Sequence, residues 1–123
     1  MNTELHQFLL QSVNEQKPCS SWNSFHKLRP NINDLTCMNI DNSVIEKADF
    51  SGMNFCGMNG QQGHFIDCDF SGADFFEAVL RDTIFENCNF HNTNFQNAQF
   101  MYCHFNNCCL LYTSPSPRDS IAS

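Results

Sequence analysis

The sequence predicts a solenoid preceded by a short helical segment. Three features of the 123-residue chain carry this prediction: a large apolar residue recurs at every fifth position, a small residue lies two positions before it, and mostly polar residues fill the rest. A period of five fits neither an α-helix, at about 3.6 residues, nor a flat strand, at about two. In a solenoid, each repeat buries its apolar side only by stacking on its neighbours.

Residues 1–30 precede the repeats and have helical spacing instead. Ser20 or Ser21 is placed to cap a second helix, and Pro30 to end it. We expect residues 1–30 to form a helical cap on the first turn of the solenoid; the alternative is a docking helix for a partner. The apolar residues at helical spacing are Leu5, Phe8, Leu9 and Val13 in the first helix, and Trp22, Phe25 and Leu28 in the second.

Residues 31–108 carry the five-residue register. Fifteen positions from 35 to 105 belong to it, and all except Gly60 are Phe, Leu or Ile. We expect the large side chains to stack inside the coil and Gly60 to leave a gap in its stack. The predicted structural stack consists of Leu35, Ile40, Ile45, Phe50, Phe55, Phe65, Phe70, Phe75, Leu80, Phe85, Phe90, Phe95, Phe100 and Phe105.

A second inward position lies two residues before each large one and is mostly small. Asp and Asn predominate at the position between the small and the large apolar residue, and turn-forming residues follow the large apolar residue. Each unit of five therefore points two side chains inward and three outward. The small inward residues are Ala48, Cys68, Ala73, Ala78, Cys88, Ala98, Cys103 and Cys108.

These units resemble a known family. Residues 48–52 read ADFSG, residues 68–72 read CDFSG and residues 73–75 read ADF. They are similar to pentapeptide repeats, whose motif is a small residue, Asp or Asn, Leu or Phe, and two variable positions. The resemblance covers residues 31–108. It implies an all-β fold: a right-handed, four-sided β-helix of about twenty residues per turn, hence about four turns here, in which residues twenty apart stack at roughly 4.8 Å.

The C-terminal segment 109–123 does not continue this pattern. Residues 109–119 read CLLYTSPSPRD, which resembles the translation of a sequencing adapter. We therefore expect residues 109–123 to be a disordered artefact outside the fold. The repeats would then be truncated at Cys108, and the uncapped C-terminal edge of the coil would favour self-association.

No catalytic, cofactor or metal site is predicted. Cys68, Cys88 and Cys108 should lie one turn apart as reduced thiols that behave as small apolar side chains. The sequence has no Cys-x-x-Cys pair with zinc spacing, phosphate-binding loop or nucleophile elbow. His64 and His104 share a side but lie two turns apart, too far to share an ion. We expect a protein that is not an enzyme.

The start of the chain lacks the regions of a signal peptide, and no apolar run reaches the ~18 residues of a membrane span. The expected location is the bacterial cytoplasm, with no membrane contact. Residues 31–108 contain ten acidic and two basic residues, a net charge of −8. Direct nucleic-acid binding is disfavoured, because neutralising phosphates needs a basic surface.

The favoured function is a non-catalytic, rigid protein-interaction module whose protein partner is unknown. Apolar residues at outward positions suggest where a partner could bind, because contiguous apolar patches mark interfaces. Val44, Ile66 and Ile84 share one side of the coil and form the candidate patch. A segment of the protein downstream of the repeats could equally cover it.

Two alternatives remain. The family resemblance implies that some members imitate duplex DNA and bind type II topoisomerases such as gyrase, which protects the enzyme from quinolones. The net charge here corresponds to about one per 2.4 Å of coil, against about one per 1.7 Å in DNA, but the acids fall on all four sides. Alternatively, the repeats are the N-terminal scaffold of a larger protein whose activity lies downstream.

Overall fold

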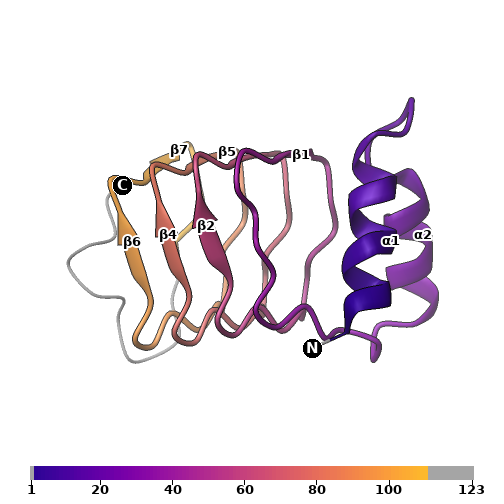
Figure 1. The fold of residues 1–123 in the computed structure, drawn as a ribbon, viewed down its shortest axis with the longest axis horizontal. Helices are drawn as coiled ribbons and strands as arrows, with labels where there is room; N and C mark the ends of the chain where they lie inside the picture. The colour runs from indigo at the N-terminus through magenta and orange to yellow at the C-terminus, as the bar shows by residue number, and fades with distance from the viewer. Residues whose placement is uncertain (1, 111–123) are drawn as a thin grey trace.

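The computed structural model describes residues 2–110, which form two helices followed by a coil (Figure 1). Neither helix is long and apolar enough to cross a membrane. The helices pack across the N-terminal end of the coil, whose strands are only three residues long. The elements are α1 (Thr3–Val13), α2 (Ser20–Leu28), β1 (Val44–Glu46), β2 (Asn59–Gln61), β3 (His64–Ile66), β4 (Val79–Arg81), β5 (Ile84–Glu86), β6 (Gln99–Met101) and β7 (His104–Asn106).

The strands build two parallel sheets, in the orders β1-β3-β5-β7 and β2-β4-β6. Each residue pairs with the residue twenty positions later, as in the register of Ile45 with Phe65 and of Phe65 with Phe85. The other two sides of the coil are held by isolated parallel bridges such as Asp34–Asn54 and Asp49–Asp69. The predicted β-solenoid with four sides is therefore the observed fold.

Large apolar side chains fill the interior of the coil. All fourteen members of the predicted stack are at most 5% exposed. The rings stack along the axis at the predicted offset: the Phe70 and Phe90 centroids are 5.0 Å apart at 4°, and those of Phe85 and Phe105 are 4.9 Å apart at 10°. Leu35 and Phe95 begin and end one stack, so about three turns of the coil separate them.

Each side of the coil ends in a tight corner two residues after the large apolar residue. Non-glycine residues at these corners have φ between 52° and 60°, the left-handed region. Eight of the fifteen corners from 37 to 107 are Asn or Gly, which tolerate this conformation best. On eight sides of the described coil, the Asp or Asn before the large residue accepts the N–H two residues on through its side-chain oxygen, as Asp69 does from Ser71 at 2.9 Å.

The environment of Gly60 differs from a simple gap. Gly60 has φ 138°, and a Cβ added there would lie 2.9 Å from the backbone nitrogen of Ile40. The Ile40 side chain extends toward a second glycine instead, because its Cδ1 lies 2.6 Å from where a Cβ of Gly63 would be. The stack is interrupted at Gly60, but the Ile40 side chain occupies space that the missing side chain of Gly63 leaves.

Two expectations for α2 are wrong. Leu28 was expected on the inner face but is 74% exposed, while His26, one turn after Trp22, is buried in its place. Neither Ser20 nor Ser21 caps the helix: its N-cap is Cys19, which makes no side-chain capping bond. The Glu15 carboxylate caps it from the preceding loop, accepting the Ser21 N–H at 2.8 Å and also the Ser21 hydroxyl.

The ladder continues past the expected end of the repeats at 108. Cys109 forms a parallel bridge with Asn89 and donates its N–H to the Cys88 carbonyl at 3.1 Å. Leu110 packs partly against the core. Backbone pairing needs no particular side chain, so these two residues can extend the coil whatever their origin. The remainder of the segment expected to derive from an adapter lies outside the described residues.

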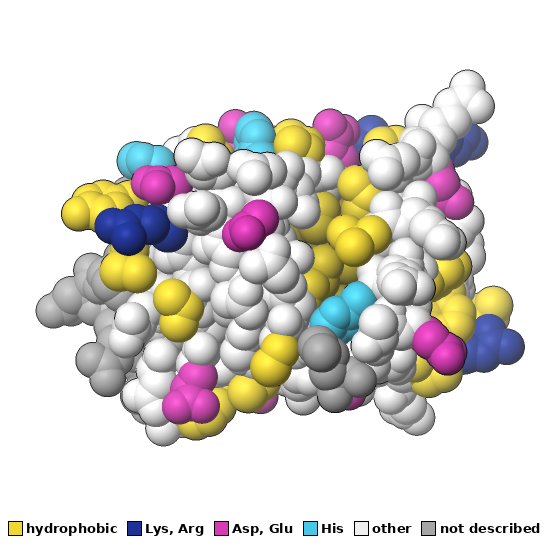
Figure 2. All heavy atoms as spheres, viewed as in Figure 1, with side chains coloured by type: hydrophobic (Ala, Val, Ile, Leu, Met, Phe, Trp, Pro, Cys, Tyr) yellow, Lys and Arg dark blue, Asp and Glu magenta, His cyan; other side chains and the backbone are white. Residues whose placement is uncertain are grey.

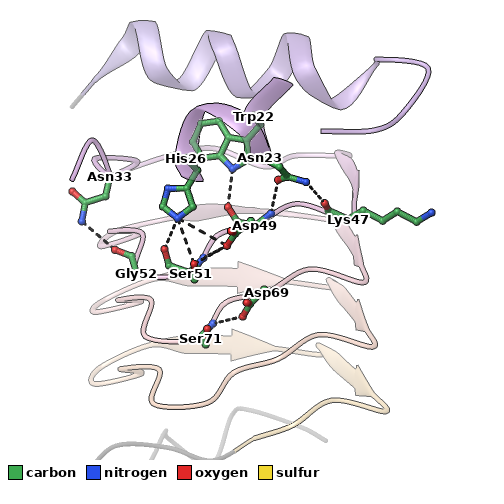
Figure 3. A network of polar contacts seen from close by, with 10 residues as sticks. All are labelled: Trp22, Asn23, His26, Asn33, Lys47, Asp49, Ser51, Gly52, Asp69 and Ser71. Atoms are coloured by element: carbon green, nitrogen blue, oxygen red, sulfur yellow. Dashed lines mark hydrogen bonds and ion pairs between the residues drawn. The ribbon is translucent and has the colours of Figure 1, made fainter. Parts of the chain in front are cut away.

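At the N-terminal end, side chains of α2 hydrogen-bond to backbone groups of the first coil that an adjacent coil satisfies elsewhere (Figure 3). The Trp22 indole Nε1 donates to the Asp49 carbonyl at 2.8 Å, and the His26 Nε2 donates to the Ser51 carbonyl at 2.7 Å. The Asn23 amide accepts the Asp49 N–H at 2.7 Å and donates to the Lys47 carbonyl at 2.8 Å. The first coil is therefore closed on this side by hydrogen bonds from the helix.

Candidate interaction surfaces

The outer face of the β1-β3-β5-β7 sheet holds the predicted patch. We call this surface the four-strand face; Figure 2 shows hydrophobic, histidine and acidic side chains following one another along it at the upper rim. The register places Val44, His64, Ile84 and His104 in one column, and Glu46, Ile66, Glu86 and Asn106 in the next. Val44 is 52% exposed, while Ile66 and Ile84 are partly buried.

The three predicted patch residues are diagonal neighbours on this face. Ile66 belongs to the level between Val44 and Ile84, but in the adjacent column. His64 lies between the two aliphatic residues of its own column, and its Nε2 approaches Glu86 Oε1 at 3.1 Å. His64 and its contact with Glu86 therefore interrupt the apolar patch between Val44 and Ile84, and the sequence analysis did not predict this contact.

The histidines of this face do not form a metal site. Ile84 separates His64 from His104 in the register, as the twenty-residue spacing predicts. Within residues 2–110, no group of three or more His, Cys, Asp or Glu side chains is arranged to hold a metal ion.

The outer face of the β2-β4-β6 sheet, the three-strand face, differs in composition. Its columns are Asn59, Val79 and Gln99 on one side, and Gln61, Arg81 and Met101 on the other. The Arg81 guanidinium lies over the ring of Tyr102, with Cζ 5.4 Å from the ring centroid. The neighbouring positions of Arg81 and Met101 could have been predicted from the twenty-residue spacing. The contact between Arg81 and Tyr102 could not, because it depends on the backbone conformation of the corner at Tyr102.

Comparison with known proteins identifies the family. The model of the pentapeptide repeat region matches residues 35–114, more than half of the chain. The chain belongs to the pentapeptide repeat family. No curated protein matches it.

Solved structures with a similar fold include two trypsin-treated variants of QnrB1, described as a plasmid-mediated fluoroquinolone resistance protein. They are 23% and 24% identical to this chain, with TM-scores of 0.42 and 0.43. In both comparisons the match covers 62% of this chain and 47% of the other. The chain thus spans less than half the length of these structures.

Several acidic side chains of the pentapeptide repeats accept hydrogen bonds from residues close to them in the sequence. Asp49 accepts the N–H and hydroxyl of Ser51, and Asp74 accepts the N–H of Phe76. Hydrogen bonds from Thr36, first its side chain and then its N–H, lower the pKa of Asp34. These carboxylates hold the corners of the coil, and the register places acids on all four sides.

Two inward cysteines of the repeats, Cys88 and Cys108, have raised pKa values, which favours the protonated thiol. Cys68 and Cys88 are buried, whereas Cys108, at the end of the described coil, is partly exposed. The Cys108 thiol lowers the pKa of Cys88, but the Cys68 thiol and burial raise it more, to about 12. The Cys88 thiol and burial raise the pKa of Cys108. Thiols held in this form are poor nucleophiles, and all eight cysteines are free.

Proposed function

We propose that this pentapeptide repeat chain is a non-catalytic, rigid protein-interaction module that binds a partner through the four-strand face. The observation that carries the proposal is that Val44, Ile66 and Ile84 lie on three successive levels of one face, in alternating columns. Their motif positions hold polar residues in most other repeats of the chain. Apolar groups at outward positions of successive coils favour an interface.

Rigidity supports this role. The strands that carry the patch are bonded to one another through continuous parallel ladders, and each is anchored by a buried ring or aliphatic side chain beneath it. A preformed surface of this kind loses little conformational entropy on binding. Glu46 and Glu86 lie on either side of Ile66 in its column, so the proposed partner surface combines apolar groups with basic ones.

The test replaces Ile84 with Asp and measures which proteins the tagged chain captures from extracts of its source cells. We expect captured partners to fall by roughly tenfold or more, because a carboxylate in an apolar contact costs at least about 1.4 kcal/mol. Gln96→Asp is the matched control: it adds the same charge on another, exposed side of the coil. If both variants capture the same partners as the parent, with the same oligomeric state, the four-strand face is not the binding surface.

A second candidate is a modulator of gyrase or another type II topoisomerase that imitates DNA. The net charge of −8 over residues 31–108 favours it, since charged rods compete for basic DNA-binding surfaces. The Asp49–Asp69 bridge places two carboxylates one above the other on one side. The acids on the remaining sides do not form a comparable row, and for this reason we rank the candidate second.

Supercoiling assays separate the two candidates. A DNA mimic should inhibit gyrase supercoiling or protect gyrase from a quinolone, with an effect that weakens as salt increases. An interaction module of the first kind should do neither.

A further inference from the structure

A cluster on the three-strand face has the composition of a binding hot spot. It consists of Val79, Arg81, Met101 and Tyr102, which we call the Arg81 cluster. Val79 is 41% exposed and Tyr102 is 68% exposed. Figure 2 shows a basic side chain flanked by hydrophobic ones at the left end of the molecule. Tyr, Arg and Met are enriched at protein interfaces relative to the rest of a protein surface.

The charge of Arg81 has no partner within the coil. No carboxylate oxygen of residues 2–110 lies within 4.0 Å of its guanidinium. Lys47 and Arg81 are the two basic residues among ten acids in residues 31–108. The guanidinium instead lies over the Tyr102 ring, a cation–π arrangement that orients its donors. An oriented and unpaired guanidinium is suited to a bidentate contact with a carboxylate.

Tyr102 itself is a poor choice for the fold. It stands at a corner with φ 57°, where a bulky side chain is strained and where Asn or Gly is frequent in this chain. Its ring is mostly exposed, so it contributes little to the core. The exposed ring is therefore accessible to a partner.

We propose that the Arg81 cluster binds a protein segment that presents a carboxylate beside an apolar side chain. The carboxylate pairs with Arg81, and the apolar group packs against Tyr102, Val79 and Met101. The net charge of −8 over residues 31–108 repels polyphosphates such as nucleic acids, so a single carboxylate in an otherwise apolar segment is the ligand that fits. The inference rests on the proposed function, and it adds a second surface with a defined ligand chemistry.

The probe is a short synthetic peptide with one glutamate among leucine and glycine residues; the comparison peptide has lysine in place of that glutamate. Both are titrated into the full chain at ~0.15 M salt, where screening beyond about 8 Å limits general repulsion. We expect the glutamate peptide to shift the NMR signals of the Arg81 side chain and the Tyr102 amide. Arg81→Gln should weaken that binding by roughly tenfold or more.

Tyr102→Asn is the second variant and separates binding from folding. Asn suits the left-handed corner, so the melting temperature should equal or exceed that of the parent, while binding of the glutamate peptide weakens. Gln62→Asn is the matched control, since Gln62 occupies the same corner two levels earlier with φ 58°; it should leave binding unchanged.

Three results would overturn the inference: equal binding of the lysine peptide, signal shifts that avoid the cluster, or a Tyr102→Asn variant that melts well below the parent. If the inference fails in this way while Ile84→Asp still abolishes partner capture, the four-strand face remains the proposed interface. If the glutamate peptide binds at the Arg81 cluster but Ile84→Asp leaves partner capture unchanged, the four-strand face is rejected as an interface and the cluster is retained.

Discussion

The first coil and the interior coils satisfy the same backbone groups in different ways. In the interior, the Asp69 N–H donates to the Ala48 carbonyl at 3.0 Å, and the Asp69 carbonyl accepts from Phe50 at 2.8 Å. Twenty residues earlier, the side chains of Asn23 and Trp22 make these two bonds with Asp49. A solenoid edge can therefore be closed by a helix, provided that its side chains present donors and acceptors at the spacing of a strand.

The difference predicts where the molecule tolerates change. An interior coil has backbone hydrogen bonds to the coils before and after it, and its buried Phe rings stack on theirs. Because its backbone groups are paired on both sides, we expect a variant there to act mainly through side-chain packing. The N-terminal junction relies on a few side-chain hydrogen bonds, supported by the buried Trp22 and its edge contact with Phe50, whose ring centroids are 5.9 Å apart. Interior variants should therefore lower global stability, and junction variants should first loosen the first coil.

The largest expected effect is that of Phe70→Ala. The Phe70 ring is fully buried and stacks on Phe50 and Phe90, at centroid distances of 5.3 and 5.0 Å. Truncation leaves a cavity in the middle of the stack, so the free energy of unfolding should fall by about 3–5 kcal/mol in chemical denaturation. Phe76→Ala, at an outward and half-exposed position, is the control and should cost less than about 1 kcal/mol. A Phe70 effect as small as that of the control would contradict the packing account.

A smaller effect is expected for Asn23→Ala at the junction. The substitution leaves the Asp49 N–H and the Lys47 carbonyl without the partners that Asn23 provides, which costs about 1–3 kcal/mol. Hydrogen exchange measures the comparison directly: the Asp49 amide should lose protection while the Asp69 amide keeps it. Ser24→Ala, on an exposed position of the same helix, controls for the change in helix propensity. Equal loss of protection at both amides would mean that the junction and the interior unfold together.

Much of the interior could be predicted from the sequence because it is periodic. One five-residue register placed the stacked rings, and a spacing of twenty placed Ile84 between His64 and His104. The corners are less easily predicted, because Asn or Gly occupies only about half of the corner positions. Lys47 and Tyr102 have the same backbone conformation although neither is Asn or Gly, because the coil imposes the corner on whatever residue falls there.

The junction could not be predicted in the same way because its contacts have no period. Asn23 and His26 bond to backbone groups 24 to 26 positions away, and nothing in their local spacing indicates such partners. Helical spacing correctly placed Trp22 inside, but it assigned Leu28 to the inner face where His26 is buried. A buried histidine that bonds to a strand edge has the same spacing as an apolar residue, so hydropathy alone cannot identify it.

The smallest expected effect concerns Glu15, which joins the loop to the start of α2. Hydrogen bonds from Ser21, first its side chain and then its N–H, lower the pKa of Glu15 from its usual 4.5. A depressed carboxyl pKa stabilises the fold above the unfolded value and loses that contribution as the pH falls through the folded value. The melting temperature of the parent should therefore exceed that of Glu15→Gln near pH 7, and the difference should shrink as the pH falls from about 5 to about 3. A difference that stays constant over this range would show that the Gln amide fails for steric reasons, and that the carboxylate charge does not distinguish this junction from the interior coils.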